Sequence, residues 1–140
     1  MNYEKIIQYR NETNAFANLI GLKITEMDKG YCKTYMPING DGFNPIDSVH
    51  GGAIFTVGDV TGGGAASSYG YQVTTISASI NYLRAGLDTT ELVGKAREIK
   101  AGKRLMTYDV EIMDQHGTIL AEGIFSYMSL GKVIAEDVFE

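Results

Sequence analysis

Asp59 is the single charged residue in the stretch from His50 to Ser68, and it stands between Gly58 and Val60. A carboxylate is costly to remove from water, so at such a position it needs either a partner or a function. In a partly desolvated cleft it is a candidate general base or nucleophile, because burial makes it more basic. The structural alternative is a carboxylate whose charge is satisfied by backbone groups or by a neighbouring lysine.

A second candidate is the tetrapeptide Val49-His50-Gly51-Gly52, which comes just before the uncharged stretch. Backbone N–H groups at the start of a helix are unpaired and carry partial positive charge, so they can polarise a carbonyl and hold an oxyanion. Glycine also lets a substrate come close to the backbone. The same residues fit an ordinary turn followed by a helix start, with His50 in a structural role.

Several other kinds of site are excluded by residue counts. The chain has two histidines, His50 and His116, and one cysteine, Cys32, which is too few for a zinc cluster. It contains neither the G-x-S-x-G motif of serine hydrolases nor a GxxxxGK[ST] phosphate loop. A net charge of −5 argues against nonspecific binding of nucleic acid. We therefore expect no metal, no cofactor and no nucleic-acid partner.

The length of 140 residues predicts one domain, spanning residues 1–140, with a single core. Cys32 cannot form an internal disulfide, so it is expected to be a buried filler. No stretch approaches the roughly 18 apolar residues of a membrane span, and Met1 to Arg10 lacks the apolar core of a signal peptide. These features predict a cytoplasmic protein that does not associate with a membrane.

The residues from His50 to Ser68 predict a long helix, because their apolar side chains recur at spacings of three and four. A helix this apolar is expected to be buried on all sides. It contains Gly62-Gly63-Gly64, and each glycine costs about 1 kcal/mol relative to alanine. We therefore expect a close approach to the bare backbone there, either by a sheet or by a second copy of the helix.

Strands are predicted on both sides of this helix. In the third strand, Thr75 and Ser77 belong to a polar set that alternates with an apolar set containing Ile76 and Ala78. Residues 3–20 predict one or two short helices that end at Gly21, and residues 39–49 predict an ordered loop. Because the turns between consecutive strands are short, we expect an antiparallel meander that wraps around the long helix, an α+β fold. The expected strands are Leu22–Met27, Tyr31–Ile38, a segment ending near Tyr82, Glu91–Lys100, Leu105–Asp114 and Thr118–Leu130.

The spaced set of Asn44, His50-Gly51-Gly52 and Asp59 resembles the hot-dog thioesterases of the phenylacetate-degradation type. The resemblance covers about Leu22 to Leu130. It departs from the family at Pro45, where glycine is frequent, and at Ala85, where proline is frequent. Further shared features are Asn81-Tyr82-Leu83-Arg84-Ala85-Gly86, Gly102-Lys103-Arg104 and a final strand that begins near Gly117 and contains Ala121.

The resemblance implies a hot-dog fold and hydrolysis of an acyl-CoA thioester, with an aromatic or a short- to medium-chain acyl group. It implies that Asp59 activates water or attacks the thioester, and that the Gly51 N–H polarises the carbonyl. Asn44 would position water or substrate, with assistance from a hydroxyl at Thr75 or, second, Ser77. The residues expected to contact the substrate and coenzyme A are His50, Gly52, Ser77, Arg84, Lys103 and Arg104.

Gly51 and Asp59 are eight residues apart, which corresponds to about 12 Å along one helix. One thioester cannot touch both residues of the same chain. If both act in one reaction, the aspartate must come from a second copy packed at a two-fold interface. We therefore predict a homodimer with a composite site, assembled further into a homotetramer as a dimer of dimers.

Two other functions are compatible with parts of the sequence. Phe43-Asn44-Pro45-Ile46 resembles part of a hot-dog hydratase signature, but that signature requires an acid at position 42 and a histidine at position 47, where this chain has Gly42 and Asp47. An enoyl-CoA hydratase is therefore disfavoured. A noncatalytic module that binds or senses acyl-CoA with the same fold is the main alternative. Asp59 discriminates against it, because a pure binder has little use for a costly carboxylate.

Overall fold

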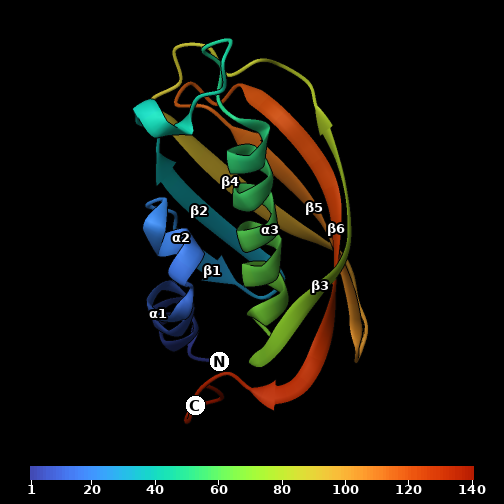
Figure 1. The fold of residues 1–140 in the computed structure, drawn as a ribbon. Helices are drawn as coiled ribbons and strands as arrows, with labels where there is room; N and C mark the ends of the chain where they lie inside the picture. Colours follow the sequence, from blue (N-terminus) through green and yellow to red (C-terminus); the bar gives the residue numbers. More distant parts are fainter.

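The protein is a six-stranded antiparallel sheet curled around one long helix (Figure 1). The computed structural model describes residues 1–140. The predicted element order and the hot-dog architecture are confirmed. The helices are α1 (Tyr3–Thr13), α2 (Ala15–Leu19), the 3-10 turn η1 (Gly40–Gly42) and α3 (Gly51–Ser67), and the strands are β1 (Lys23–Asp28), β2 (Tyr31–Pro37), β3 (Tyr71–Tyr82), β4 (Glu91–Ala101), β5 (Leu105–Met113) and β6 (Ile119–Val133).

The order of the strands differs from the predicted meander. The sheet runs β1-β2-β4-β5-β6-β3, so β3 pairs with β6 and β4 pairs with β2. Helix α3 crosses the concave face of the sheet, so the chain enters β3 at the edge opposite β1, and residues 83–90 carry it back to β4 beside β2 (Figure 1). The predicted antiparallel pairing of consecutive strands is confirmed for β1–β2, β4–β5 and β5–β6. It is wrong for β3, which was expected beside β4. A helix that spans the sheet separates strands that are consecutive in the chain.

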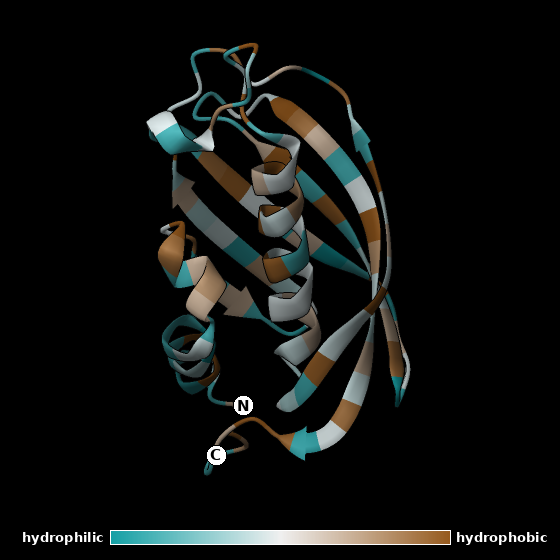
Figure 2. Ribbon diagram, viewed as in Figure 1, coloured by the Kyte–Doolittle hydropathy of each residue, from teal (hydrophilic) through white to brown (hydrophobic).

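Helix α3 supplies the centre of the hydrophobic core. Figure 2 shows mainly hydrophobic and neutral colours along it, and Ile54, Val57 and Ala65 are buried against the sheet. At 17 residues it is the longest helix, and no helix of the chain has the length and apolar character to cross a membrane. Phe55 and Asp59 remain partly exposed, so the predicted burial on all sides is wrong for part of its surface. The sheet contributes fully buried Leu92, Tyr108, Ile112, Phe125 and Tyr127.

The glycine run of α3 makes room for side chains of the same protein. A Cβ at Gly62 would overlap the hydroxyl of Tyr127, and one at Gly64 would overlap the thiol of Cys32, which is buried as predicted. A Cβ at Gly63 would lie 2.9 Å from the guanidinium of Arg10. The predicted close approach is therefore made within one chain, by side chains from β6, β2 and α1.

Gly62→Ala is expected to lower the free energy of unfolding. The added methyl would gain up to about 1 kcal/mol in helix propensity, but displacing the Tyr127 hydroxyl is an overpacking that costs about 1–3 kcal/mol, and the overlap at this position favours the upper end of that range. Chemical denaturation measures the difference. Gly40→Ala is the control, because a Cβ at Gly40 would meet no atom within 4 Å. Equal stability of the two variants would contradict this account of the glycine run.

Candidate active site

The start of α3 leaves one backbone N–H free. His50 is the N-cap residue: its Nδ1 accepts the N–H of Gly52 at 2.8 Å, and its carbonyl oxygen accepts the N–H groups of Ala53 and Ile54. The N–H of Gly51 has no hydrogen-bond partner within the chain. Because the partial positive charge of a helix is concentrated at its first turn, this N–H is a donor available to a ligand.

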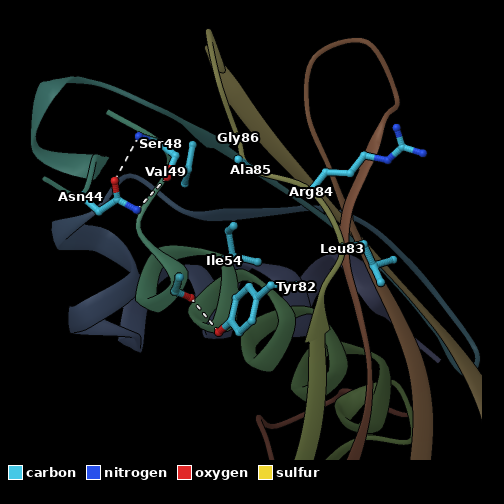
Figure 3. Close-up of a pocket in the computed structure, with 10 residues that line it drawn as sticks. Asn44, Ser48, Val49, Ile54, Tyr82, Leu83, Arg84, Ala85 and Gly86 are labelled. Atoms are coloured by element: carbon cyan, nitrogen blue, oxygen red, sulfur yellow. Dashed lines mark hydrogen bonds between the residues drawn. The ribbon is translucent and has the colours of Figure 1, made fainter. Parts of the chain in front are cut away.

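Gly51 lines a pocket of about 290 Å³ (Figure 3). The hydroxyl of Tyr82, the last residue of β3, donates to the carbonyl oxygen of Gly51 at 3.0 Å and ties the end of β3 to the start of α3. Gly51 and the segment after β3 thus meet in one place, although about 30 residues separate them in sequence. The lining residues are Asn44, Ser48, Val49, Gly51, Ile54, Tyr82, Leu83, Arg84, Ala85 and Gly86.

The Asn44 amide, on the wall of this pocket, holds the preceding loop in shape. Its Oδ1 accepts the N–H groups of Ile46 at 3.0 Å and Ser48 at 3.1 Å, and its Nδ2 donates to Ser48 Oγ at 2.7 Å (Figure 3). An amide nitrogen carries two hydrogens, so one N–H of Asn44 is left for a ligand. The loop itself uses the other bonding positions of this side chain.

His50 and Gly52 lie at the exposed start of α3 but not in the pocket of Gly51. They line a separate hollow of about 630 Å³ that also contains Phe16 and Leu19 of α2. Because His50 Nδ1 accepts the N–H of Gly52, the His50 side chain caps the start of α3. Of the glycine pair, only Gly51 has a free N–H, and only Gly51 lines the pocket.

The carboxylate of Asp59 is held at one oxygen by two hydroxyl groups. Its Oδ1 accepts from Thr75 Oγ1 at 2.6 Å and from the Tyr127 hydroxyl at 3.2 Å. Its Oδ2 has no hydrogen-bond partner, and no lysine or arginine forms an ion pair with Asp59. The expected structural alternative, a charge satisfied by a lysine or by backbone N–H groups, is therefore absent. One oxygen is fixed and the other is free.

A β-bulge decides which hydroxyl of β3 faces Asp59. Thr75 lies opposite Tyr127 and Ser77 lies opposite Ser126, which leaves Ile76 as the extra residue. Because side chains alternate across a strand, Thr75 shares the α3-facing side with the buried Tyr127, whereas Ser77 is on the outer face with Ser126. The uninterrupted alternation expected from the sequence put Thr75 and Ser77 on one face, and the bulge separates them.

The three basic residues expected at coenzyme A lie at two opposite ends of the sheet. Arg84 lines the pocket of Gly51. Lys103 and Arg104, in the turn between β4 and β5, line a hollow of about 500 Å³ with Tyr71 and Ser129, at the opposite end of the sheet (Figure 1). All three side chains are exposed. A single chain therefore does not bring them together.

Tyr127 is the member of this site that the sequence analysis missed. Its alternating apolar neighbours in β6 make it look like an ordinary core residue, and it is 1% exposed. Burial, with the charge of Asp59 adding to it, raises the pKa of Tyr127, so its hydroxyl stays protonated and acts as a donor. The one feature of the sequence that could have indicated it is Gly62, which lies one turn after Asp59 and permits a large side chain to pack against the helix.

Comparisons with known proteins agree with this architecture. The thioesterase superfamily model matches residues 47–121. The acyl-coenzyme A thioesterase PaaI of Escherichia coli (strain K12) is 30% identical over 110 residues, which cover 79% of this chain and 79% of the relative. The solved structure of E. coli PaaI from the phenylacetic acid degradation operon superposes with a TM-score of 0.88 at 26% identity, covering 94% of this chain and 95% of that chain.

A second solved structure contains a ligand. The protein smu.793 from Streptococcus mutans UA159, bound to acetyl CoA, superposes with a TM-score of 0.74 at 27% identity, covering 80% of this chain and 90% of that chain. The matched family region includes the start of α3, Asp59 and Thr75. The chain therefore belongs to the thioesterase superfamily, as a hot-dog acyl-CoA thioesterase of the phenylacetate-degradation type.

Proposed function

We propose that this enzyme hydrolyses an aromatic or short- to medium-chain acyl-CoA to the free acid and coenzyme A, with Asp59 as general base or nucleophile. The observation that carries the proposal is the carboxylate itself: its Oδ1 is anchored by Thr75 and Tyr127, and its Oδ2 is free. Relatives named as an acyl-CoA thioesterase and solved with acetyl CoA support the substrate class.

The free N–H of Gly51 is the second group that takes part in the proposed reaction. As a general base, Asp59 takes a proton from the water that attacks the thioester carbonyl carbon, and the Gly51 N–H donates to the oxygen that becomes an oxyanion. As a nucleophile, Asp59 attacks the carbon itself, and water then cleaves the resulting anhydride. In both routes the tetrahedral intermediate expels the sulfur of coenzyme A. Asn44 and Arg84, on the wall of the same pocket, are placed to contact the substrate.

Two copies of the chain are needed to build this site, because about 12 Å separates Gly51 and Asp59 along α3. The edge strand β3 is suited to join them: its 12 residues include neither a charge nor a proline. Exposed edges normally carry such features to prevent pairing. At the other edge, β1 is a 6-residue strand that contains Lys23, Glu26 and Asp28 and is interrupted by a bulge.

The contacts along β3 indicate where the two-fold axis would lie. Thr75 binds Asp59, Tyr82 binds Gly51, and the midpoint between Thr75 and Tyr82 falls between Ala78 and Ser79. Antiparallel pairing of two β3 strands about that point brings the Asp59 end of one chain against the Gly51 end of the other. The same rotation carries the turn of Lys103 and Arg104 toward the Arg84 end of the second chain, so all three basic residues can serve one coenzyme A.

Asp59→Asn is expected to reduce acyl-CoA hydrolysis at least about a hundredfold, because the amide can neither accept the proton nor attack the thioester. Release of free thiol from a panel of aromatic, short and medium acyl-CoAs measures the effect and the acyl preference. Asp47→Asn is the matched control, since Asp47 is an exposed loop residue with a φ of 59°, a conformation that asparagine accepts. Undiminished hydrolysis by Asp59→Asn would overturn the proposal.

Gly51→Pro tests the free N–H with little other change. Proline is favoured at the first position of a helix, and the preceding His50 has the extended ψ of 131° that proline requires. A Cβ at Gly51 would lie 3.4 Å from the Tyr82 ring, an ordinary contact. Loss of one oxyanion donor lowers kcat about a hundred- to a thousandfold. Gly51→Ala keeps the N–H and should retain activity; equal activity of both variants would contradict the assigned role.

The shared site predicts complementation between two inactive chains. Asp59→Asn and Gly51→Pro chains, co-expressed with different tags and purified as mixed dimers, should regain hydrolysis, because one of the two sites then has an intact Gly51 from one chain and an intact Asp59 from its partner. Each variant alone stays inactive. Mixed dimers that form and remain as inactive as their parents would show that the site lies within one chain.

A further inference from the structure

We propose that Tyr127 is a positioning residue for Asp59, whose buried hydroxyl sets the direction of the reactive carboxylate from the sheet side. The inference rests on the proposed role of Asp59 in hydrolysis. It assigns a function to a side chain on β6 that resembles an ordinary core residue in the sequence.

The Tyr127 hydroxyl binds Asp59 at two points. Its single hydrogen is shared between the backbone carbonyl oxygen of Asp59, at 2.8 Å, and Oδ1 of the same residue, at 3.2 Å, so the hydroxyl bridges the main chain and the side chain. Thr75 donates to that Oδ1 from β3, at 2.6 Å. An aspartate has two side-chain torsions, and hydrogen bonds to one oxygen from two strands fix both. The direction of the free Oδ2 follows from them.

Packing holds the tyrosine in place independently of Asp59. Its ring meets the Tyr108 ring edge to face at a centroid distance of 6.1 Å, and its hydroxyl fills the space left by the absent side chain of Gly62. The guanidinium of Arg10, from α1, lies over Gly63 beside the same ring and donates to Ser67 Oγ at 2.7 Å. The hydroxyl is therefore presented by a rigid part of the core, as a support for a reactive group requires.

Tyr127→Phe removes this hydroxyl and keeps the ring. We expect kcat to fall roughly tenfold or more, which is the effect of one hydrogen bond to a charged group, while KM stays near the wild-type value. Tyr108→Phe is the matched control, because Tyr108 is equally buried and its hydroxyl has no hydrogen-bond partner. Its kcat should be unchanged. Thr75→Val tests the second donor to the same oxygen and should also lower kcat rather than raise KM.

A positioning role and a purely structural role predict different effects of Tyr127→Phe when it is combined with Asp59→Asn. If Tyr127 acts through Asp59, adding Tyr127→Phe to Asp59→Asn should cost little further activity; a structural defect would lower the residual rate again by the same factor. Assays run below the melting temperature of each variant, on protein shown to be folded, keep loss of function apart from unfolding.

The outcomes separate the two proposals. If Asp59→Asn abolishes hydrolysis while Tyr127→Phe matches Tyr108→Phe, the role of Tyr127 is refuted and that of Asp59 stands. If Asp59→Asn retains activity, both are overturned. A loss in Tyr127→Phe that is fully additive with Asp59→Asn, or that appears in KM alone, also refutes the positioning role.

Discussion

A carboxylate can persist on the otherwise uncharged helix α3 because two strands of the sheet supply hydroxyl donors to it. Thr75 and Tyr127 face each other across the β3–β6 pair and bind the same oxygen of Asp59. Hydrogen bonds to an ionised acceptor are stronger than those between neutral groups, and they offset much of the cost of removing the charge from water. The second oxygen has no hydrogen-bond partner, which leaves it available to a ligand.

Several unrelated features of the fold follow from this arrangement. The bulge at Ile76 turns Thr75 toward α3. Gly62 has no side chain, so the Tyr127 hydroxyl can reach the helix backbone. Each feature costs something locally, in helix propensity or in the regularity of the β-ladder. Both features place a hydroxyl group against Asp59, and this explains Gly62, the first glycine of the run.

The Gly51 N–H, the other group of the proposed site, is positioned by different means. The N–H of Gly51 is free because a helix cannot pair its first donors internally, and His50 binds the neighbouring N–H of Gly52. Tyr82 then fixes this helix start against the end of β3. One strand therefore binds both halves of the proposed site, the Asp59 half through Thr75 and the Gly51 half through Tyr82. The same strand has the uncharged open edge, so substrate binding and subunit pairing would depend on a single element.

The sequence by itself determined the elements and two groups of the proposed site. Helix α3, the strands, Asp59 and Gly51 could be recognised because periodicity, helix-start chemistry and an isolated charge are local properties of the chain. The tertiary structure alone decided that β3 lies at the sheet edge beside β6, that Thr75 rather than Ser77 faces Asp59, and that the Tyr127 hydroxyl contacts Asp59. These features depend on which strands pair and in what register. Residues distant in sequence set that pairing. The alternation of polar and apolar residues within one strand does not reveal a single-residue bulge.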